Sequence, residues 1–307
     1  MQTAFISHPA CERHDMGAGH PECPERLGAI QDQLIAAGLF DRLRRFEAPL
    51  ASPAQLLRVH SAGYVAEIRR AAPAQGLTRL DPDTAMNPHS LEAALRAAGS
   101  VVLATDLVMA REVENAFCSV RPPGHHATRS RAMGFCIFNN VAVGVAHAIH
   151  AHGLRRVAIA DFDVHHGNGT EDIFRDETRV MLLSTFQHPF YPYSGAQTGN
   201  EHLIHVPLPA GTAGTAFREA VAGRWLPALE AFRPEMLFIS AGFDGHREDD
   251  MASFGLVEAD YAWVTEQLKD VAVRHAQGRI VSSLEGGYAL DALGRSAAAH
   301  IKVLAGL

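Results

Sequence analysis

The sequence predicts an α/β fold in which an open parallel β-sheet is flanked by helices. Short apolar or β-branched runs alternate with longer stretches rich in Ala and Leu, whose apolar residues recur with the period of a helix. This alternation is typical of βαβ units, whose strands are buried on both faces and therefore read as continuous apolar runs. With 307 residues, of which 47% are hydrophobic, the chain can bury a large core.

Seven strands and seven long helices are predicted along the chain. The strands are residues 3–8, 115–120, 156–161, 180–185, 202–208, 236–242 and 280–286. Several helices begin at the Pro, Ser, Asp or Asn that is typical of a helix start. The helices are residues 25–37, 54–71, 89–111, 139–152, 215–232, 258–277 and 290–305. No repeat, low-complexity tract or Gly/Ser linker interrupts this series, so we interpret residues 1–307 as one domain.

Composition and charge argue against several classes of partner. The net charge is −7 and no Lys/Arg run is present, whereas a nucleic-acid-binding surface requires a basic patch. The first residues, MQTAFISHPA, do not form a signal peptide, and no apolar run approaches the roughly 20 residues of a membrane span. Cys11, Cys23, Cys118 and Cys136 form no C-x-x-C pair, which indicates neither a disulfide framework nor a cysteine zinc site. We therefore expect a soluble, cytoplasmic protein without a nucleic-acid or membrane partner; its oligomeric state is unknown at this stage.

Four clusters of polar residues follow predicted strands directly. They are RPPGHHA (121–127), DFDVHHGNG (161–169), GFDGH (242–246) and EGGY (285–288). In an open parallel sheet, the loops at the carboxyl ends of the strands line the ligand crevice. We therefore expect all four clusters to open onto one rim of the sheet.

The segment DFDVHHGNG contains the residue types of a zinc site. Alternate side chains of an extended strand share a face, so Asp161, Asp163 and His165 would point to the same side. Zinc accepts imidazole nitrogen and carboxylate oxygen, and a catalytic site has three protein ligands and one position for water. Asp163 and His165 would supply two ligands, and Asp244 at the end of another strand would supply the third. The alternative is that these residues only cap helices or shape turns, but their coincidence across several loops favours a metal site.

The adjacent pair His125 and His126 indicates proton transfer. Attack of water on a carbonyl needs a base that takes a proton and an acid that protonates the leaving amine. Two imidazoles can divide these roles if a carboxylate raises the pKa of one relative to the other. Asp161 is the candidate partner of His125, and the neutral Asn168 could orient His126 without raising its basicity. The alternative is that the two rings only satisfy buried backbone groups.

Tyr288, which follows two glycines, is a candidate donor to an oxyanion. A phenol hydroxyl on a flexible Gly-Gly loop could donate a hydrogen bond to a tetrahedral intermediate beside the metal. A single exposed tyrosine more often serves packing, so this interpretation depends on the other loops.

In their order along the chain, these motifs resemble the zinc-dependent histone deacetylase superfamily. The resemblance is to the class II type of bacterial histone deacetylase-like amidohydrolase, which is related to acetylpolyamine amidohydrolases and acetoin-utilisation proteins. The matching segments are GHPECPERLGAI (19–30), RPPGHHA, GFCIFNNVAV (134–143), DFDVHHGNGTEDIF (161–174), SAGFDGHREDD (240–250) and LEGGY (284–288). The resemblance implies the arginase-like α/β fold, with a single histone deacetylase-like catalytic domain over residues 1–307.

The resemblance also implies roles for individual residues. It places Zn²⁺ on the three ligands named above, with His126 as general base and His125 as its electrostatic or acid partner. Tyr288 would polarise the amide carbonyl of the substrate. The implied potassium ligands are Asp161, Asp163, His165 and Ser184 for one ion, and the backbone of Phe174 and Val180 for a second ion.

The resemblance further implies a channel for the aliphatic stem of the substrate. Gly134, Phe135 and Tyr191 match its walls, and the loops 9–24 and 72–90 would flank its mouth. Met251 stands near a position where polyamine-selective relatives carry an acidic residue, which weakens an assignment to polyamines. The acidic residues within 247–250 could nevertheless attract a cationic substrate.

Three functions remain open from the sequence. The first is a zinc amidohydrolase that removes acetyl or another short acyl group from an acetyl-lysine peptide, an acetylpolyamine or another acylated small amine. The second is a binuclear-metal ureohydrolase, which would need a second set of acids that the motif around Asp244 does not offer. The third is a non-catalytic acyl-amine binding protein, which would be expected to have lost Tyr288 or a metal ligand.

Overall fold

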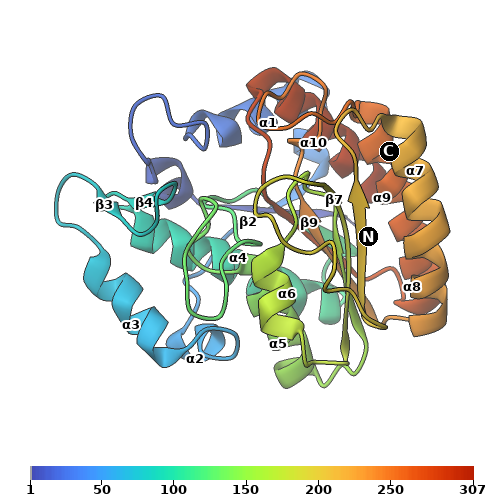
Figure 1. The fold of residues 1–307 in the computed structure, drawn as a ribbon, viewed down its shortest axis with the longest axis horizontal. Coiled ribbons are helices and arrows are strands. Elements are labelled where there is room, and N and C mark those ends of the chain that lie inside the picture. Colours follow the sequence, from blue (N-terminus) through green and yellow to red (C-terminus); the bar gives the residue numbers. More distant parts are fainter. Residues whose placement is uncertain (1) are drawn as a thin grey trace.

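An eight-stranded sheet forms the centre of the structure, a computed structural model that describes residues 2–307 (Figure 1). Its strands are β1 (Ala4–Ser7), β2 (Arg44–Glu47), β5 (Asn115–Cys118), β6 (Val157–Asp161), β7 (Val180–Gln187), β8 (Leu203–Leu208), β9 (Met236–Ala241) and β10 (Ile280–Leu284). They lie in the order β2-β1-β5-β10-β9-β6-β7-β8, and every neighbouring pair is parallel. The predicted open parallel sheet is therefore confirmed.

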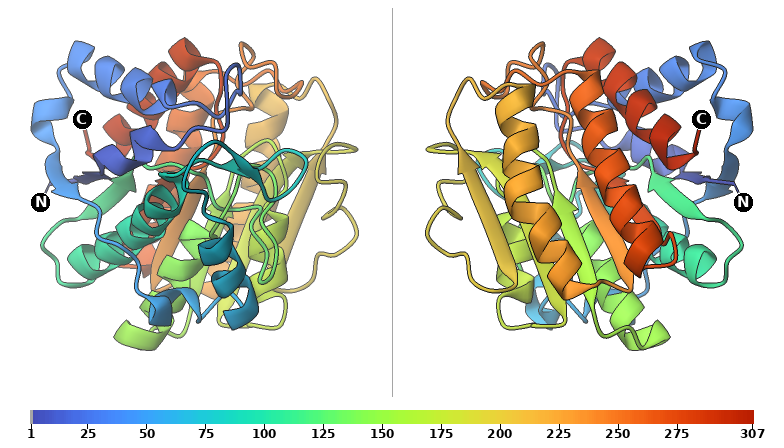
Figure 2. Two further views of the ribbon diagram at one scale, coloured as in Figure 1. Left: turned by 90° about the vertical axis from the view of Figure 1, so that its left-hand side faces the viewer. Right: turned by 90° about the vertical axis from the view of Figure 1, so that its right-hand side faces the viewer.

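Helices cover both faces of this sheet (Figure 2). One face carries α4 (Ser90–Met109), α5 (Asn140–His152) and the short α6 (Asn168–Phe174). The other carries α7 (Gly214–Ala220), α8 (Leu226–Phe232), α9 (Glu258–His275) and α10 (Leu290–Leu304), with α1 (Glu25–Ala36) packed on α10. Strands β6, β7, β9 and β10 are buried along their whole length, which explains their continuous apolar sequences.

The remaining elements are short. They are two 3-10 helices at Pro9–Arg13 and Phe40–Arg42, the helices α2 (Pro53–Leu56) and α3 (Ala62–Ala71), and the antiparallel pair β3 (Thr78–Arg79) and β4 (Ala85–Met86). None of the helices in the described part of the chain has both the length and the apolar character needed to cross a bilayer.

The prediction of one helix over residues 54–71 is wrong, because the chain forms α2 and α3 with a break between them. His60 lies in this break, with its Nδ1 2.9 Å from the carbonyl oxygen of Thr128 and its Nε2 accepting from the backbone N–H of Asn139. Ser61 then caps α3 by accepting a hydrogen bond from the backbone N–H of Tyr64. Contacts with a distant loop therefore interrupt a stretch that has helical periodicity.

The predicted helix 215–232 is continuous, but it contains a π-helical turn at Val221–Trp225 between α7 and α8. Pro227 lies in the first turn of α8 and has no backbone N–H to donate to the preceding turn. A wider turn immediately before a proline accommodates this missing hydrogen bond.

The four polar clusters predicted to share a rim do so. The clusters follow β5, β10, β9 and β6, which are adjacent in the sheet. Because these strands are parallel, their carboxyl ends lie at the same edge, and the loops that follow them meet there.

Candidate active site

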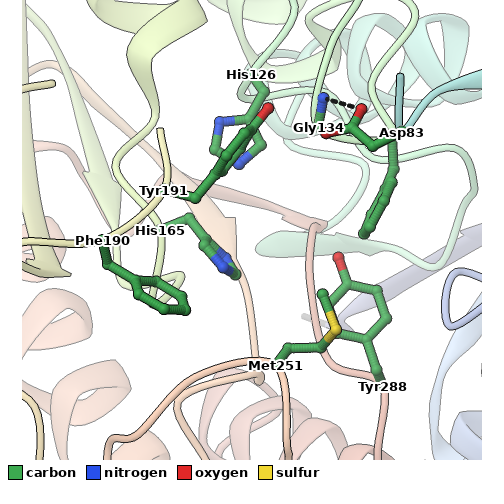
Figure 3. Close-up of a pocket in the computed structure, with 9 residues that line it drawn as sticks. Asp83, His126, Gly134, His165, Phe190, Tyr191, Met251 and Tyr288 are labelled. Atoms are coloured by element: carbon green, nitrogen blue, oxygen red, sulfur yellow. Dashed lines mark hydrogen bonds between the residues drawn. The ribbon is translucent and has the colours of Figure 1, made fainter. Parts of the chain in front are cut away.

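A cavity of about 290 Å³ opens at this edge of the sheet (Figure 3). It is lined by Asp83, His126, Gly134, Phe135, His165, Phe190, Tyr191, Met251 and Tyr288. The three residues predicted to form the channel wall, Gly134, Phe135 and Tyr191, are among them, and so is Met251, the predicted substrate-binding residue at the position that is acidic in polyamine-selective relatives. Asp83 and Phe190 are additional wall residues that the sequence did not predict.

The two loops predicted to flank the mouth of the cavity both contribute to it. His20, from loop 9–24, packs edge-on against Phe135 with ring centroids 4.7 Å apart. Asp83, from loop 72–90, accepts a hydrogen bond of 3.0 Å from the backbone N–H of Gly134, which Figure 3 marks. The mouth is therefore built by segments distant in sequence from the sheet loops.

Asp163, His165 and Asp244 form the predicted cluster of metal-ligating atoms at the base of the cavity. The His165 Nδ1 atom lies 3.1 Å from Asp163 Oδ1 and 3.1 Å from Asp244 Oδ2. All three residues are buried. The side chains thus converge from the loops after β6 and β9, as expected for loops at the carboxyl ends of parallel strands.

The chemistry of this cluster fits a zinc ion. One imidazole nitrogen and two carboxylate oxygens are ligands that zinc accepts. Burial alone would lower the pKa of His165, but the hydrogen bonds to Asp163 and Asp244 outweigh burial and raise it to about 10. The cluster therefore stabilises positive charge at the point where the three side chains meet.

The approach of the third loop to this cluster depends on glycine. The backbone N–H of Gly286 donates to Asp163 Oδ2 over 2.9 Å. A Cβ atom at position 286 would lie 2.1 Å from Asp244 Oδ2 and 2.6 Å from Asp163 Oδ2, so only glycine fits there. The loop after β10 can therefore pack directly against the two carboxylates.

His125 and His126 lie side by side, with ring centroids 4.0 Å apart, and each contacts its predicted partner. His125 Nδ1 lies 3.0 Å from Asp161 Oδ2, and His126 Nδ1 lies 2.7 Å from Asn168 Oδ1. Both acceptors are oxygen atoms, so each ring donates through Nδ1 and directs Nε2 away from its partner.

The two histidines differ in pKa as a consequence of these surroundings. Burial acts to lower the pKa of His125, but the carboxylates of Asp163 and Asp161 outweigh it and hold the pKa well above its usual value. Burial, reinforced by the neighbouring His125 and His165, lowers the pKa of His126 well below its usual value. These surroundings favour the charged form of His125 and the neutral form of His126, a difference that would allow the two rings distinct roles in proton transfer.

Glu285 is a buried residue of the predicted EGGY cluster to which the sequence assigned no role. Its Oε2 atom accepts from the backbone N–H groups of Gly124 and His125 at 2.6 and 3.1 Å, and Ser240 Oγ lies 3.2 Å from its Oε1. Burial raises its pKa to about 7. The signal in the sequence was an acidic residue at the end of an apolar strand. Glu285 holds the loop that carries the two histidines in place.

Tyr288 lines the cavity on a loop that other side chains position. Asp249 Oδ2 accepts from the backbone N–H groups of Tyr288 and Ala289 at 2.6 and 3.0 Å. The guanidinium carbon of Arg26 lies 4.8 Å from the centre of the Tyr288 ring, and Arg26 Nε donates to the carbonyl oxygen of Gly287 over 2.6 Å. Burial raises the pKa of Tyr288 well above its usual value, so the hydroxyl retains its proton.

A buried ionic network connects this loop to the histidine loop. Glu22 bonds to Arg26 Nη1 at 3.1 Å and forms a two-point contact with Arg121, and the side chains of all three residues are fully buried. Arg121 also donates to the carbonyl oxygens of Cys11 and His14. The segment that contains Glu22 therefore fixes the relative position of two loops of the site.

We expect Glu22→Gln to destabilise the fold by about 3–5 kcal/mol, because it leaves two buried guanidinium groups without their charge partner. The free energy of unfolding, measured by denaturant titration, tests this. Glu92→Gln is the matched control: Glu92 pairs with Arg13 on the surface, with side chains 41% and 51% exposed. The control should change stability by less than about 1 kcal/mol. Equal effects of the two substitutions would contradict the role of the network.

The predicted potassium ligands lie next to the candidate zinc site. Asp161 and Ser184 are register partners on β6 and β7. Ser184 is fully buried, and its hydroxyl lies 3.3 Å from His166 Nδ1. Phe174 ends α6 and Val180 begins β7, so the second predicted pair flanks the turn between these elements.

Comparisons with known proteins identify a shared domain family. Residues 20–304 match the histone deacetylase domain. The chain is 40% identical over 278 residues to a histone deacetylase-like amidohydrolase of Pseudomonas aeruginosa, covering 88% of this chain and 73% of that protein. It is 36% identical over 299 residues to a protein of Archaeoglobus fulgidus named probable deacetylase, covering 95% and 82%. The crystal structure of the HDA15 HD domain superposes with a TM-score of 0.92 at 35% identity, covering 99% of this chain and 88% of that one.

Proposed function

The chain belongs to the histone deacetylase domain family, and we therefore propose that it is a zinc-dependent deacetylase that hydrolyses the amide of an acylated, lysine-like amine. Residues 1–307 would form its single catalytic domain. The observation that carries the proposal is a connected set of three metal-ligating side chains, two adjacent histidines and one tyrosine, of which His165, His126 and Tyr288 line one cavity. This arrangement contains every group that the hydrolysis of an amide requires.

The residues around the cluster would divide the proton transfers. A zinc ion held by Asp163, His165 and Asp244 would supply a Lewis acid for the amide carbonyl and lower the pKa of a water molecule. His126 is neutral and donates through Nδ1 to Asn168, so its Nε2 lone pair can accept a proton.

His125 and Tyr288 would act on charge that develops on the substrate. The positive charge of His125 can stabilise the oxyanion, or its proton can pass to the leaving amine. The hydroxyl of Tyr288 can donate a hydrogen bond to the carbonyl oxygen, because its raised pKa keeps it protonated.

The walls of the cavity suit a linear aliphatic stem. Phe135, Phe190, Tyr191 and Met251 present aromatic or apolar surface. Phe190 stacks on the ring of His165 with centroids 5.6 Å apart, so the apolar wall reaches the candidate zinc ligand. A methylene chain that ends in an amide would be desolvated by this wall up to the reacting carbonyl.

One observation favours an acetylpolyamine as the alternative substrate. Asp83 lines the cavity, and its carboxylate would attract the second amine of a polyamine even though Met251 is uncharged. A binuclear ureohydrolase has less support. It would need ligands for a second metal ion, whereas the metal-ligating cluster at this cavity has three members among residues 2–307.

We expect the zinc-loaded protein to hydrolyse an acetyl-lysine peptide with a higher kcat/KM than acetylputrescine. Measuring both substrates side by side on wild type and on Asp83→Asn separates the two proposals. If acetylputrescine is hydrolysed faster and this advantage disappears in Asp83→Asn, the polyamine alternative replaces the peptide substrate. Failure to hydrolyse either would contradict both assignments and direct attention to other acyl amides.

The proposal includes potassium as a second cofactor. Carboxylate, hydroxyl and main-chain oxygens suit such a hard cation. Asp161 and Ser184 offer them on the neighbouring strands β6 and β7, and Asp163 and His165 offer them in the loop after β6. A second ion at the backbone of Phe174 and Val180 would stabilise the turn that ends α6.

A further inference from the structure

A second cluster of metal-ligating side chains lies outside the cavity, between α6 and β8. His166 Nε2, Glu171 Oε2 and His205 Nε2 lie within 4.8 Å of one another, and all three residues are buried. The Glu171 Oε2 atom is 2.6 Å from His166 Nε2 and 4.0 Å from His205 Nε2. One carboxylate oxygen is thus placed between two imidazole nitrogens.

His205 directs an unused lone pair into this cluster. Its Nδ1 atom lies 2.8 Å from the carbonyl oxygen of Gly195, which can only accept, so Nδ1 carries the proton. The Nε2 atom is buried in a side chain that is 2% exposed, and it has no hydrogen-bond partner among residues 2–307. A buried acceptor without a partner is unfavourable and calls for a bound group.

The side chains of His166 and Glu171 are also held in place, each through the polar atom that does not face the cluster. His166 Nδ1 lies 3.3 Å from Ser184 Oγ, and Glu171 Oε1 accepts from Arg175 Nη2 over 3.1 Å. Metal-binding histidines and carboxylates are typically oriented in this way, with the second polar atom bonded to a backbone or side-chain group. Each of the three side chains therefore has the support expected of a ligand.

We propose that His166, Glu171 and His205 bind a structural zinc ion that is separate from the ion at the candidate active site. Zinc bonds of about 2.0–2.1 Å place tetrahedral ligand atoms about 3.3 Å apart, a value bracketed by the separations of 2.6 and 4.0 Å. His205 also lines a surface cavity of about 300 Å³, so the cluster lies close to a surface from which an ion could enter.

The ion would fasten the loop that carries part of the substrate channel. Loop 189–200 contains Phe190 and Tyr191, which line the cavity, and Gly195, whose carbonyl oxygen holds His205. A Cβ atom at position 195 would lie 2.6 Å from the His166 ring, so the loop packs directly against the cluster. Binding of zinc would therefore fix the channel wall to the sheet.

A third cluster, formed by Asp106, His147 and His152, is a weaker candidate and serves as a control. Asp106 Oδ1 lies 2.7 Å from the Nε2 atom of each histidine. Arg58 Nη1, which can only donate, lies 3.0 Å from His147 Nδ1. The proton of the His147 ring is therefore on Nε2, which donates a hydrogen bond to Asp106. This contact is like that of His166 with Glu171, but the side chain of Asp106 is 49% exposed, and among residues 2–307 no ring nitrogen of this cluster is a buried acceptor without a partner, as His205 Nε2 is.

Zinc content measured by mass spectrometry after removal of loosely bound metal tests the proposal. In an Asp163→Ala/Asp244→Ala background, which lacks two ligands of the candidate active site, we expect one zinc per chain. Adding His205→Asn should remove it, whereas adding His152→Asn should not. Absence of zinc from the background protein, or zinc that survives His205→Asn, would overturn the proposal.

The same measurement in the otherwise wild-type chain guards against misfolding of the background protein. Wild type should hold two zinc ions, His205→Asn and Glu171→Gln one each, and His152→Asn two, with folding checked by circular dichroism. Unchanged zinc content in both His205→Asn and Glu171→Gln would contradict the site. A failure of the proposed catalytic zinc would instead appear as unchanged zinc content in Asp163→Ala alone, so the two failures are distinguishable.

Discussion

Asp163→Ala is expected to remove one zinc ion per chain and to reduce amide hydrolysis to background. The substitution leaves His165 and Asp244 as the only protein ligands and also removes the acceptors for the backbone N–H groups of His165 and Gly286. Changes to residues that merely orient metal ligands typically cost about 10–100-fold in affinity or activity. Loss of a ligand should exceed this, and we expect the same result for Asp244→Ala.

Zinc content and hydrolysis of an acetyl-lysine peptide, measured on the same preparations, test this expectation. Asp270→Ala is a matched control, because Asp270 is exposed on α9 and lies outside the metal-ligating clusters of the described chain. It should keep wild-type zinc content and most of the activity. If Asp163→Ala and Asp244→Ala both retained the zinc content of wild type, the ligand assignment would be wrong.

Local patterns predicted every strand of the eight-stranded sheet except the edge strand β2. Strands β6, β7, β9 and β10 are covered on both faces, so burial alone makes their sequences apolar and recognisable. The edge strand β2 has the sequence RRFE, with three of its four residues exposed, and it was missed because solvent on its surface removes that signal. The break between α2 and α3 was missed for a different reason, since it depends on contacts with residues more than 60 positions away.

The site was predicted where its residues follow neighbouring parallel strands. The order of strands brings the loops after β5, β6, β9 and β10 together, so polar residues at these ends can be grouped without coordinates. Residues that approach from elsewhere gave no such signal. Asp83 comes from the segment between β3 and β4, and Glu22 comes from the segment before α1.

His205 illustrates the limit of motif-based reasoning most clearly. It lies in the middle of β8, at a position that reads as part of an apolar strand. Only the packing of loop 189–200 against the sheet reveals that its Nε2 atom faces Glu171. Spacing along the chain cannot predict a cluster whose members are 5 and 34 residues apart on different elements.

Tyr288→Phe is expected to keep the full zinc content and to lower kcat by about 100-fold or more, the usual cost of removing one oxyanion donor. Phenylalanine retains the ring that packs edge-on against Phe135 and lies under Arg26, and the backbone contact with Asp249 is unaffected. The substitution therefore removes the hydroxyl while leaving the loop in place. Because the hydroxyl would act on charge that develops during the reaction, kcat should fall more than KM changes.

Tyr193→Phe is the matched control for this prediction. Tyr193 is 77% exposed and does not line the cavity, so loss of its hydroxyl should leave kcat within about twofold of wild type. Both variants should contain as much zinc as wild type, which separates loss of an oxyanion donor from loss of metal. A Tyr288→Phe protein with the turnover of Tyr193→Phe would exclude the tyrosine from the mechanism and leave His125 as the group that stabilises the oxyanion.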